Sequence, residues 1–236
     1  MKIKLVLLWF VLLVFNLAYA QTPEKPVQVV DSLYKEDQFY AGLTYNILVN
    51  RPGGVSQTGF SLGLQAGFIK DMPLNKRRNL ALGLGIGYSY NLFNQNLGVF
   101  EGPENDLSYI VLDASYELEY SRNSYFLHMV EVPFQIRWRT STASDYRFWR
   151  IYTGFNVGYV FHSITKFKGE IGKERLRNTE GFNKLQYGLT LSAGYNTWNF
   201  YVYYPLNTLF EDANTFLTQE HIDMKSIKLG LIFYLL

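Results

Sequence analysis

A strict two-residue alternation of side chains is the feature that most limits what this chain can form. In residues 80–90 the even positions are Leu, Ile or Tyr, whereas the odd positions are Ala, Gly or Ser. Successive side chains of a β-strand point to opposite faces, so this pattern predicts a strand with one bulky apolar face and one face of small residues. A helix does not sort its side chains in this way.

The same alternation recurs along most of the chain. It is clear in residues 39–50, 60–68, 130–138, 151–161 and 185–196. Each run approaches or exceeds the roughly 9 to 11 residues that a tilted strand needs to cross a bilayer. The chain also contains 19 Tyr, 18 Phe and 19 Gly, which suits many strands and tight turns. We therefore predict an all-β fold, a closed antiparallel transmembrane β-barrel.

The connections between these runs predict how many strands cross the membrane. Short connections are expected at residues 71–78, 141–147 and 197–199, and longer ones at 51–58, 92–124, 166–183 and 207–224. The expected crossings are eight: residues 38–50, 58–70, 79–91, 125–140, 148–163, 184–197, 199–206 and 225–236. Because short turns of such barrels face the periplasm, both termini are expected there.

One further alternating segment, residues 108–121, would make the number of strands odd, which a closed antiparallel barrel with both termini on one side does not allow. We interpret it as a strand that extends above the membrane within the second long loop and turns back through residues 121–124. A ten-stranded barrel, with another strand within residues 207–224, is the alternative.

The first 20 residues resemble a secretory signal peptide. Lys2 and Lys4 precede an apolar run over residues 5–15, and Ala18 and Ala20 supply the small residues of a cleavage site before Gln21. Residues 21–37 are polar and are expected to form a periplasmic segment, either a flexible tail or a docking peptide. Residues 38–236 form the expected barrel. With no Cys in the chain, we expect neither disulfides nor a lipid-modified cysteine, and the predicted location is the cell outer membrane.

Polar and charged side chains are predicted to fill the barrel. Between residues 125 and 140 the apolar face consists of even positions, so the odd positions point inward. The inward set comprises Glu131, Gln135, Arg137 and Arg139, together with Gln186 from a later strand. Since the interior of an eight-stranded barrel has room only for side chains, we expect a plug of ion pairs. A translocation path lined by Glu131, Arg137 and Arg139 is the alternative.

Two features concern the contacts of the barrel with the membrane. Trp138, Trp149 and Trp198 gather near the short connections, as expected of an aromatic belt at the membrane boundary. The last crossing ends in an alternating strand with Phe233 and Tyr234, as in substrates of the outer-membrane insertion machinery. The expected partners are therefore outer-membrane lipid and that machinery.

Motifs that carry chemistry are few. The glycines of residues 83–87 lack the GxGxxG spacing of a dinucleotide loop and lie within a strand. The net charge is +2 and the basic residues are scattered apart from Lys76, Arg77 and Arg78, so nucleic acid is not an expected partner.

The three histidines do not predict a catalytic or metal site. From the alternation in each strand, His128 is expected to face lipid and His162 to point inward, with Ser163 on the outer face. The two histidines are therefore not expected to converge. His221 lies in the last long loop near acidic residues and is expected to be solvated. We predict no catalytic residue, cofactor or metal.

Several stretches resemble the PorT-type outer-membrane β-barrel family of the Bacteroidota. The residues that carry the resemblance are Val130-Glu131-Val132-Pro133-Phe134, Tyr152-Thr153-Gly154-Phe155-Asn156-Val157-Gly158-Tyr159 and Gln186-Tyr187-Gly188-Leu189-Thr190-Leu191-Ser192-Ala193-Gly194-Tyr195. The resemblance implies a role in type IX secretion or gliding. Pro133 cannot donate to a strand ladder, so a bulge or irregular pairing is expected there.

Three functional hypotheses follow. The leading one is a non-enzymatic structural or accessory subunit of an outer-membrane assembly, with protein partners in a secretion or envelope complex. The second is a small porin-like solute channel. The third is a hydrolase at the outer rim that uses His128 or His162.

Overall fold

The computed structural model describes residues 37–102, 106–112, 119–140, 149–170 and 172–235. Within these ranges no helix is long and apolar enough to span a bilayer. The strands are β1 (Gln38–Val49), β2 (Leu62–Pro73), β3 (Leu80–Asn94), β4 (Leu97–Glu101), β5 (Leu107–Val111), β6 (Tyr120–Arg139), β7 (Trp149–Gly169), β8 (Gly172–Arg177), β9 (Leu185–Tyr195), β10 (Trp198–Pro205) and β11 (Lys225–Leu235). The predicted signal peptide and residues 21–36 lie outside the described residues.

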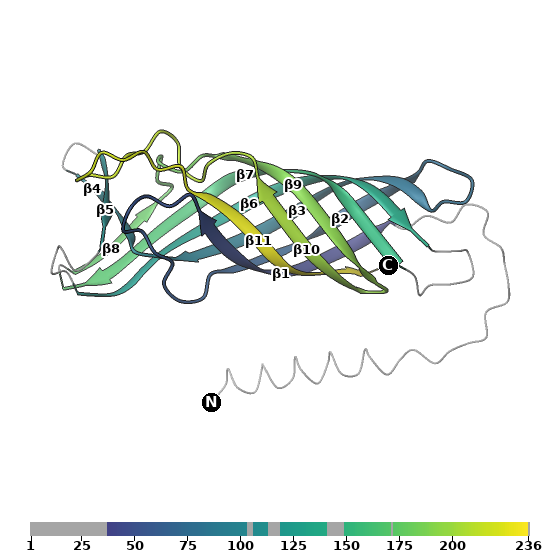
Figure 1. The fold of residues 1–236 in the computed structure, drawn as a ribbon, viewed down its shortest axis with the longest axis horizontal. Helices are drawn as coiled ribbons and strands as arrows, with labels where there is room; N and C mark the ends of the chain where they lie inside the picture. The colour runs from purple at the N-terminus through teal and green to yellow at the C-terminus, as the bar shows by residue number, and fades with distance from the viewer. Residues whose placement is uncertain (1–36, 103–105, 113–118, 141–148, 171, 236) are drawn as a thin grey trace, which may run out of the picture. The chain divides into compact units, whose positions relative to one another are not determined.

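Eight strands close into an antiparallel barrel (Figure 1). Their order is β6-β3-β2-β1-β11-β10-β9-β7, and β6 pairs with β7 to complete the wall. The first and last strands form one seam, with partners from Phe39↔Leu235 to Val49↔Lys225. The predicted eight-stranded barrel is confirmed, and the ten-stranded alternative is wrong.

The connections alternate in length as predicted. Residues 74–79 and 196–197 are short turns at one end of the barrel, which we call the short-turn rim. The connections at the other end, the long-loop rim, comprise residues 50–61, 95–119, 170–184 and 206–224. The third expected short connection, residues 141–147, lies outside the described residues. Which rim faces the periplasm stays a prediction.

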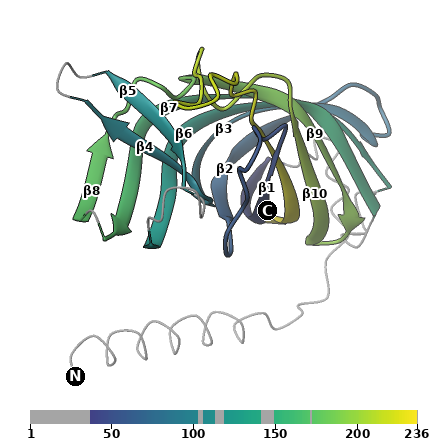
Figure 2. The ribbon, with the colours of Figure 1, turned by 60° about the vertical axis from the view of Figure 1, so that its left-hand side comes forward.

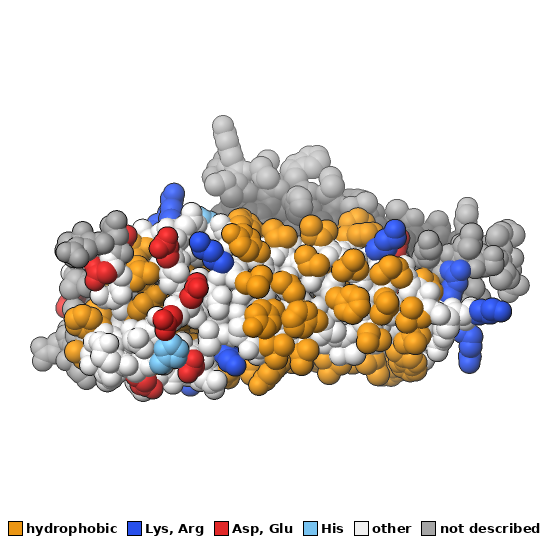
Figure 3. Space-filling view, turned by 90° about the horizontal axis from the view of Figure 1, so that it is seen from above, with side chains coloured by type: hydrophobic (Ala, Val, Ile, Leu, Met, Phe, Trp, Pro, Cys, Tyr) orange, Lys and Arg blue, Asp and Glu red, His pale blue; other side chains and the backbone are white. Residues whose placement is uncertain are grey.

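The alternation of side chains follows the wall of the barrel. Every second residue of β1 and of β10 is buried, and the residues between them are largely exposed. The exposed side chains are mainly Leu, Ile, Val, Phe, Tyr and Trp. Figure 3 shows them as an apolar band between two ends that carry charged side chains. Such a band is the surface that a bilayer requires of a spanning barrel.

The wall continues beyond the barrel at the long-loop rim. There β6 and β7 extend as a pair, and β8 pairs with β7 in place of β9. The β4–β5 hairpin lies at the same end (Figure 2). The predicted turn at residues 121–124 is therefore wrong, because these polar residues belong to β6, where β7 satisfies their backbone groups. Of the predicted ninth strand, residues 108–111 lie in β5 and residues 120–121 begin β6, whereas residues 113–118 lie outside the described residues.

A β-bulge in β7 changes which side chains face inward. Met129 is paired with Val160 and His128 with His162, so Phe161 is an extra residue. Beyond it the parity is reversed: Ser163 is buried and His162 lies on the outer face. The prediction that His162 points inward is wrong for this reason.

Pairing around Pro133 is irregular on one side of β6. The β3–β6 ladder runs from Leu84↔Phe134 to Gly87↔Glu131 without partners for Val132 and Pro133, although its register is unchanged. On the other side Pro133 is paired with Asn156 of β7. The expected irregularity is present as an interrupted ladder rather than as a bulge, since proline has no N–H to donate.

Candidate functional site

The interior at the short-turn rim is occupied by a carboxylate shared between two guanidinium groups. Asp71 Oδ1 lies 2.9 Å from Arg137 Nη1, and Asp71 Oδ2 lies 2.8 Å from Arg139 Nη2; all three side chains are fully buried. Arg139 Nε donates to the carbonyl of Arg78 at 2.9 Å, and Arg137 also donates to Gln38. Gly83 leaves room for the Arg137 side chain, because a Cβ at position 83 would lie only 2.8 Å from Arg137 Cδ.

Tyrosine rings pack above this network. The Arg137 guanidinium lies 4.3 Å from the centre of the Tyr152 ring and 5.8 Å from that of Tyr234. The two rings meet edge to face at 5.2 Å. They belong to a buried cluster that also contains Tyr40, Ile69, Tyr201, Tyr203 and Ile232. Cation–π contacts and aromatic packing therefore add to the ion pairs that fill this level.

A second charged group occupies the middle of the barrel. Glu131 accepts hydrogen bonds from Ser89 Oγ at 2.6 Å and from Asn156 Nδ2 at 3.0 Å. Lys228 Nζ lies 3.6 Å from Glu131 Oε1 and 5.0 Å from the centre of the Tyr203 ring. A carboxylate held by an ammonium and two neutral donors is the arrangement that a buried charge requires.

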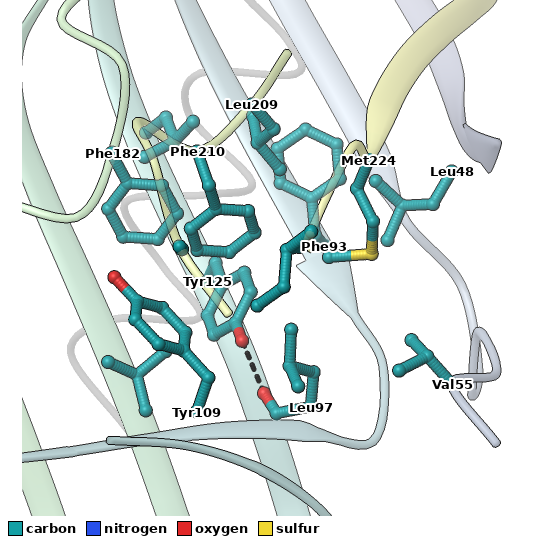
Figure 4. Packing of buried hydrophobic residues seen from close by; sticks show 14 of the residues in the cluster. Leu48, Val55, Phe93, Leu97, Tyr109, Tyr125, Phe182, Leu209, Phe210 and Met224 are labelled. Carbon is teal, nitrogen blue, oxygen red and sulfur yellow. Dashed lines mark hydrogen bonds between the residues drawn. The ribbon is translucent and has the colours of Figure 1, made fainter. Parts of the chain in front are cut away.

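Beyond this level, residues of β4, β5 and β6 and of the long loops form an apolar cap (Figure 4). We define the cap by its aromatic residues Tyr109, Tyr125, Phe182 and Phe210, which pack with Leu97, Leu209 and Met224. Phe182 and Phe210 stack at 4.9 Å, and the Tyr125 hydroxyl donates to the carbonyl of Leu97. Burial raises the pKa of Tyr109 to about 12, so its hydroxyl remains protonated at neutral pH.

Between the cap and the Glu131 group the remaining space is small. A cavity of about 20 Å³ is lined by residues that include Met129, Gln186, Tyr203 and Lys228. This volume has room for about one water molecule. Side chains thus fill the barrel at three levels, namely the Asp71 network, the Glu131 group and the cap.

The structure places all five predicted interior residues inside the barrel. Their exposed fractions are 2% for Glu131, 4% for Gln135, 0% for Arg137 and Arg139, and 8% for Gln186. Sequence reasoning missed Asp71 because it was assigned to a connection, whereas β2 continues to Pro73. It also missed Lys228, although the alternation of β11 places Lys228 on the same face as the buried Ile232 and Tyr234.

The histidines come together on the outer face of the wall. The rings of His128 and His162 lie 5.5 Å apart, contrary to the prediction that they do not converge. His128 Nδ1 lies 2.7 Å from the Tyr88 hydroxyl, and His162 Nδ1 lies 2.5 Å from Asn178 Oδ1. Catalytic histidines of acyl-transfer enzymes instead contact a carboxylate and a nucleophilic hydroxyl.

His221 lies apart from the other two histidines. It occupies the exposed last loop, where its Nε2 lies 3.4 Å from Asp223 Oδ1. Across the described ranges, no group of three His, Cys, Asp or Glu side chains could hold a metal ion.

A comparison with family profiles identifies the family of this barrel. The profile of the outer membrane protein beta-barrel domain matches residues 19–211. The chain belongs to this outer-membrane β-barrel family. Among solved structures, this family member is similar to Ail, the attachment invasion locus protein of Yersinia pestis. The alignment has 12% sequence identity, covers 85% of this chain and 100% of that chain, and has a TM-score of 0.30. No curated protein matches it.

In this outer-membrane β-barrel, exposed tryptophans stand near the short-turn rim. Trp138, Trp149 and Trp198 have exposed fractions of 41%, 60% and 64%. Trp149 packs on Tyr195 at 5.5 Å and Trp198 on Phe233 at 4.8 Å, so each belongs to a pair of aromatic rings on the outer wall. Their position agrees with the predicted aromatic belt, and the depth of the membrane boundary stays a prediction.

Proposed function

We propose that this outer-membrane β-barrel is a non-enzymatic structural or accessory subunit of a larger outer-membrane assembly. The observation that carries the proposal is the filling of the barrel at both ends, by the Asp71 network at one and by the cap at the other. A solute channel needs a continuous aqueous path, which such packing opposes. The extended β6–β7–β8 sheet and the β4–β5 hairpin instead provide surface outside the membrane.

The assembly we favour is the type IX secretion and gliding apparatus, on the basis of the resemblance to the PorT-type family. The three stretches that carry it lie in β6, β7 and β9, which are neighbours in the wall. In this proposal the signal peptide at residues 1–20 directs export, and the periplasmic segment at residues 21–37 is available to a partner.

Purification from native membranes tests the proposal. The full chain, tagged at its C-terminus, is extracted in mild detergent and analysed by native mass spectrometry, with an unrelated eight-stranded barrel carrying the same tag as the control. We expect a stoichiometric complex with other envelope proteins that the control barrel does not bring down. A bare monomer in every mild detergent would count against the proposal.

Conductance in planar bilayers tests the competing porin-like function. Because side chains occupy the barrel at three levels, the purified chain is expected to give no stable single-channel steps above those of detergent alone. A large porin inserted under the same conditions is the positive control. Reproducible steps from the folded chain would establish an open path and overturn the filled-barrel argument.

A further inference from the structure

Beyond the bulge in β7, strands β6, β7 and β8 bring six basic side chains to one face. Residues paired across antiparallel strands lie on the same side of a sheet. Arg122 is paired with Lys168, which is paired with Lys173; Lys166 is paired with Arg175. We call these residues, together with Arg177, the basic face: Arg122, Lys166, Lys168, Lys173, Arg175 and Arg177.

The basic face continues the outer wall of the barrel. In β6, Arg122 shares its parity with the outer-face residues His128 and Val130 and with the buried Ser124 and Phe126, whereas Asn123 and Tyr125 are buried on the inner side. In β7, Phe167 is buried opposite Glu174. Arg122, Lys166 and Lys168 therefore lie on the outer surface of the strands that form the barrel wall lower down, and β8 adds Lys173, Arg175 and Arg177 beside them.

Like charges are concentrated here. Within the described residues, none of the six cations forms an ion pair within 4.0 Å. Glu101 and Glu180 line a groove of about 540 Å³ beside β8 together with Arg175 and Arg177, but they too remain beyond ion-pair distance. Adjacent positive charges repel one another, so an anionic ligand would stabilise this surface.

Lys166 shows the effect of this crowding. Its Nζ lies 4.4 Å from the centre of the Phe126 ring, which the Arg122 guanidinium also covers at 5.5 Å. Burial, with Arg175 and Arg122 nearby, lowers the pKa of the Lys166 amine. A negative group bound between these side chains would oppose that shift.

The distance of the basic face from the apolar band matches the polar layer of a membrane. Phe161 is the last exposed aromatic residue of β7, and Lys166 follows five positions later. With the rise and tilt of a barrel strand, this places the Lys166 backbone on the order of 10 Å beyond the band. Lys and Arg side chains reach back along apolar surface towards the interface, so their charged ends can meet headgroups.

We propose that the basic face binds the phosphate groups of lipid headgroups in the leaflet at the long-loop rim. Phosphate is the chemistry that several Arg and Lys side chains on one surface recognise. The lipid source is favoured over a free anion because the face continues the lipid-facing wall. Lipids bound there would hold the extended β6–β7–β8 sheet against the membrane surface.

The test compares two lipids that differ only in the phosphate. The full-length barrel in mixed micelles is titrated with phosphatidic acid and with diacylglycerol of the same chains, and retained lipid is measured by native mass spectrometry. The variant Lys168→Gln/Lys173→Gln/Arg175→Gln removes three exposed charges of the basic face. The matched control, Lys70→Gln/Lys76→Gln/Arg77→Gln, removes three exposed charges near the short-turn rim. Heat-modifiable electrophoretic mobility verifies that each variant is folded.

We expect the wild type and the control to prefer phosphatidic acid, and the affinity of the basic-face variant for it to fall by about tenfold or more. Millimolar inorganic phosphate should not displace the lipid. Equal retention of the two lipids, or an unchanged affinity in the basic-face variant, would overturn the proposal. Displacement by inorganic phosphate would show a free-anion site instead, and loss of only a copurifying acidic protein would show a protein-docking surface.

Discussion

At the scale of single residues, Asp71 is the carboxylate that two buried arginines share. It contacts the guanidinium groups of both Arg137 and Arg139 in a region that solvent does not reach. Taking an ionised group out of water has a large cost that is offset only by a well-placed opposite charge. The inward positions of Arg137 and Arg139 follow from the alternation of β6, but their partner is supplied by β2.

Replacing Asp71 with Asn tests this role. The variant removes the negative charge that both guanidinium groups contact, so we expect the free energy of unfolding to fall by about 3 kcal/mol. Urea titration of the barrel in lipid vesicles, followed by tryptophan fluorescence, measures the change.

Asp223→Asn is the matched control for that substitution. Asp223 pairs with His221 in an exposed loop, and the side chains are 61% and 50% exposed. Such a pair contributes at most about 1 kcal/mol. Equal losses for the two variants would show that the Asp71 network is not the dominant contribution.

At the scale of elements, the bulge in β7 separates a barrel strand from a surface strand. Phe161 has no partner in the β6 ladder, and the β7–β9 ladder ends before it, at Tyr159↔Leu185. The residues beyond the bulge pair with β6 and β8 as a separate set. Removing the extra residue should therefore regularise the ladder without moving any other side chain to the opposite face.

Two single-residue deletions in β7 test this. Deletion of Phe161 is expected to leave a folded, heat-modifiable barrel with a slightly lower melting temperature, because only the outer-face contacts of Phe161 are lost. Deletion of Phe155 removes the same residue type from the middle of the strand and moves all residues on one side to the wrong face, so folding should fail. If the Phe161 deletion also failed to fold, the bulge would be a required element.

The eight barrel strands are predictable from the sequence because both faces of the wall are constrained, one by lipid and the other by a narrow interior. Outside the membrane that constraint ends. Residues 121–124 have the composition of a turn yet lie in β6, and β8, with the sequence GKERLR, has Leu176 as its single large apolar side chain. Pairing with β7 determines both, and pairing partners are not visible in one sequence.

The basic face was missed for a related reason. Five of its six residues lie within 166–177, which the sequence predicts to be a long connection, and the pairing of β8 with β7 brings them to one face. The bulge in β7 aligns that face with Arg122 and with the outer wall. Near Phe161, odd-numbered and even-numbered positions both contain apolar residues. The alternation pattern therefore could not show that β7 has an extra residue there. The same limitation produced the wrong orientation of His162.

At the scale of the whole molecule, the cap and the barrel differ in how they are held together. The barrel has a ladder on both sides of every strand, with one interruption between β3 and β6 at Pro133. The cap loops that carry Phe182 and Phe210 are held by isolated β-bridges, such as Phe182↔Phe210, and by side-chain packing, as in the stack of the same two rings. Regions that lack backbone ladders open locally at a smaller free energy than the global unfolding.

Phe210→Ala is expected to loosen the cap alone. Phe210 is 1% exposed, so its loss should accelerate amide hydrogen exchange across residues 206–224 and leave β9 and β10 protected. Hydrogen exchange with mass spectrometry measures both regions. Phe216→Ala is the control in the same loop, since Phe216 is 56% exposed and should have little effect. Equal acceleration in the strands would show that the cap and barrel unfold as one unit.

The seam between β1 and β11 has a consequence for biogenesis. β1 meets its second neighbour only when Lys225–Leu235 has docked on it, so the wall stays open along one edge until this pairing forms. Contacts so distant along the chain form late, and an open strand edge invites pairing with other chains. Closure at this seam therefore protects two strands at once, because a barrel in which β11 has not docked leaves one edge of β1 and one edge of β10 without a partner.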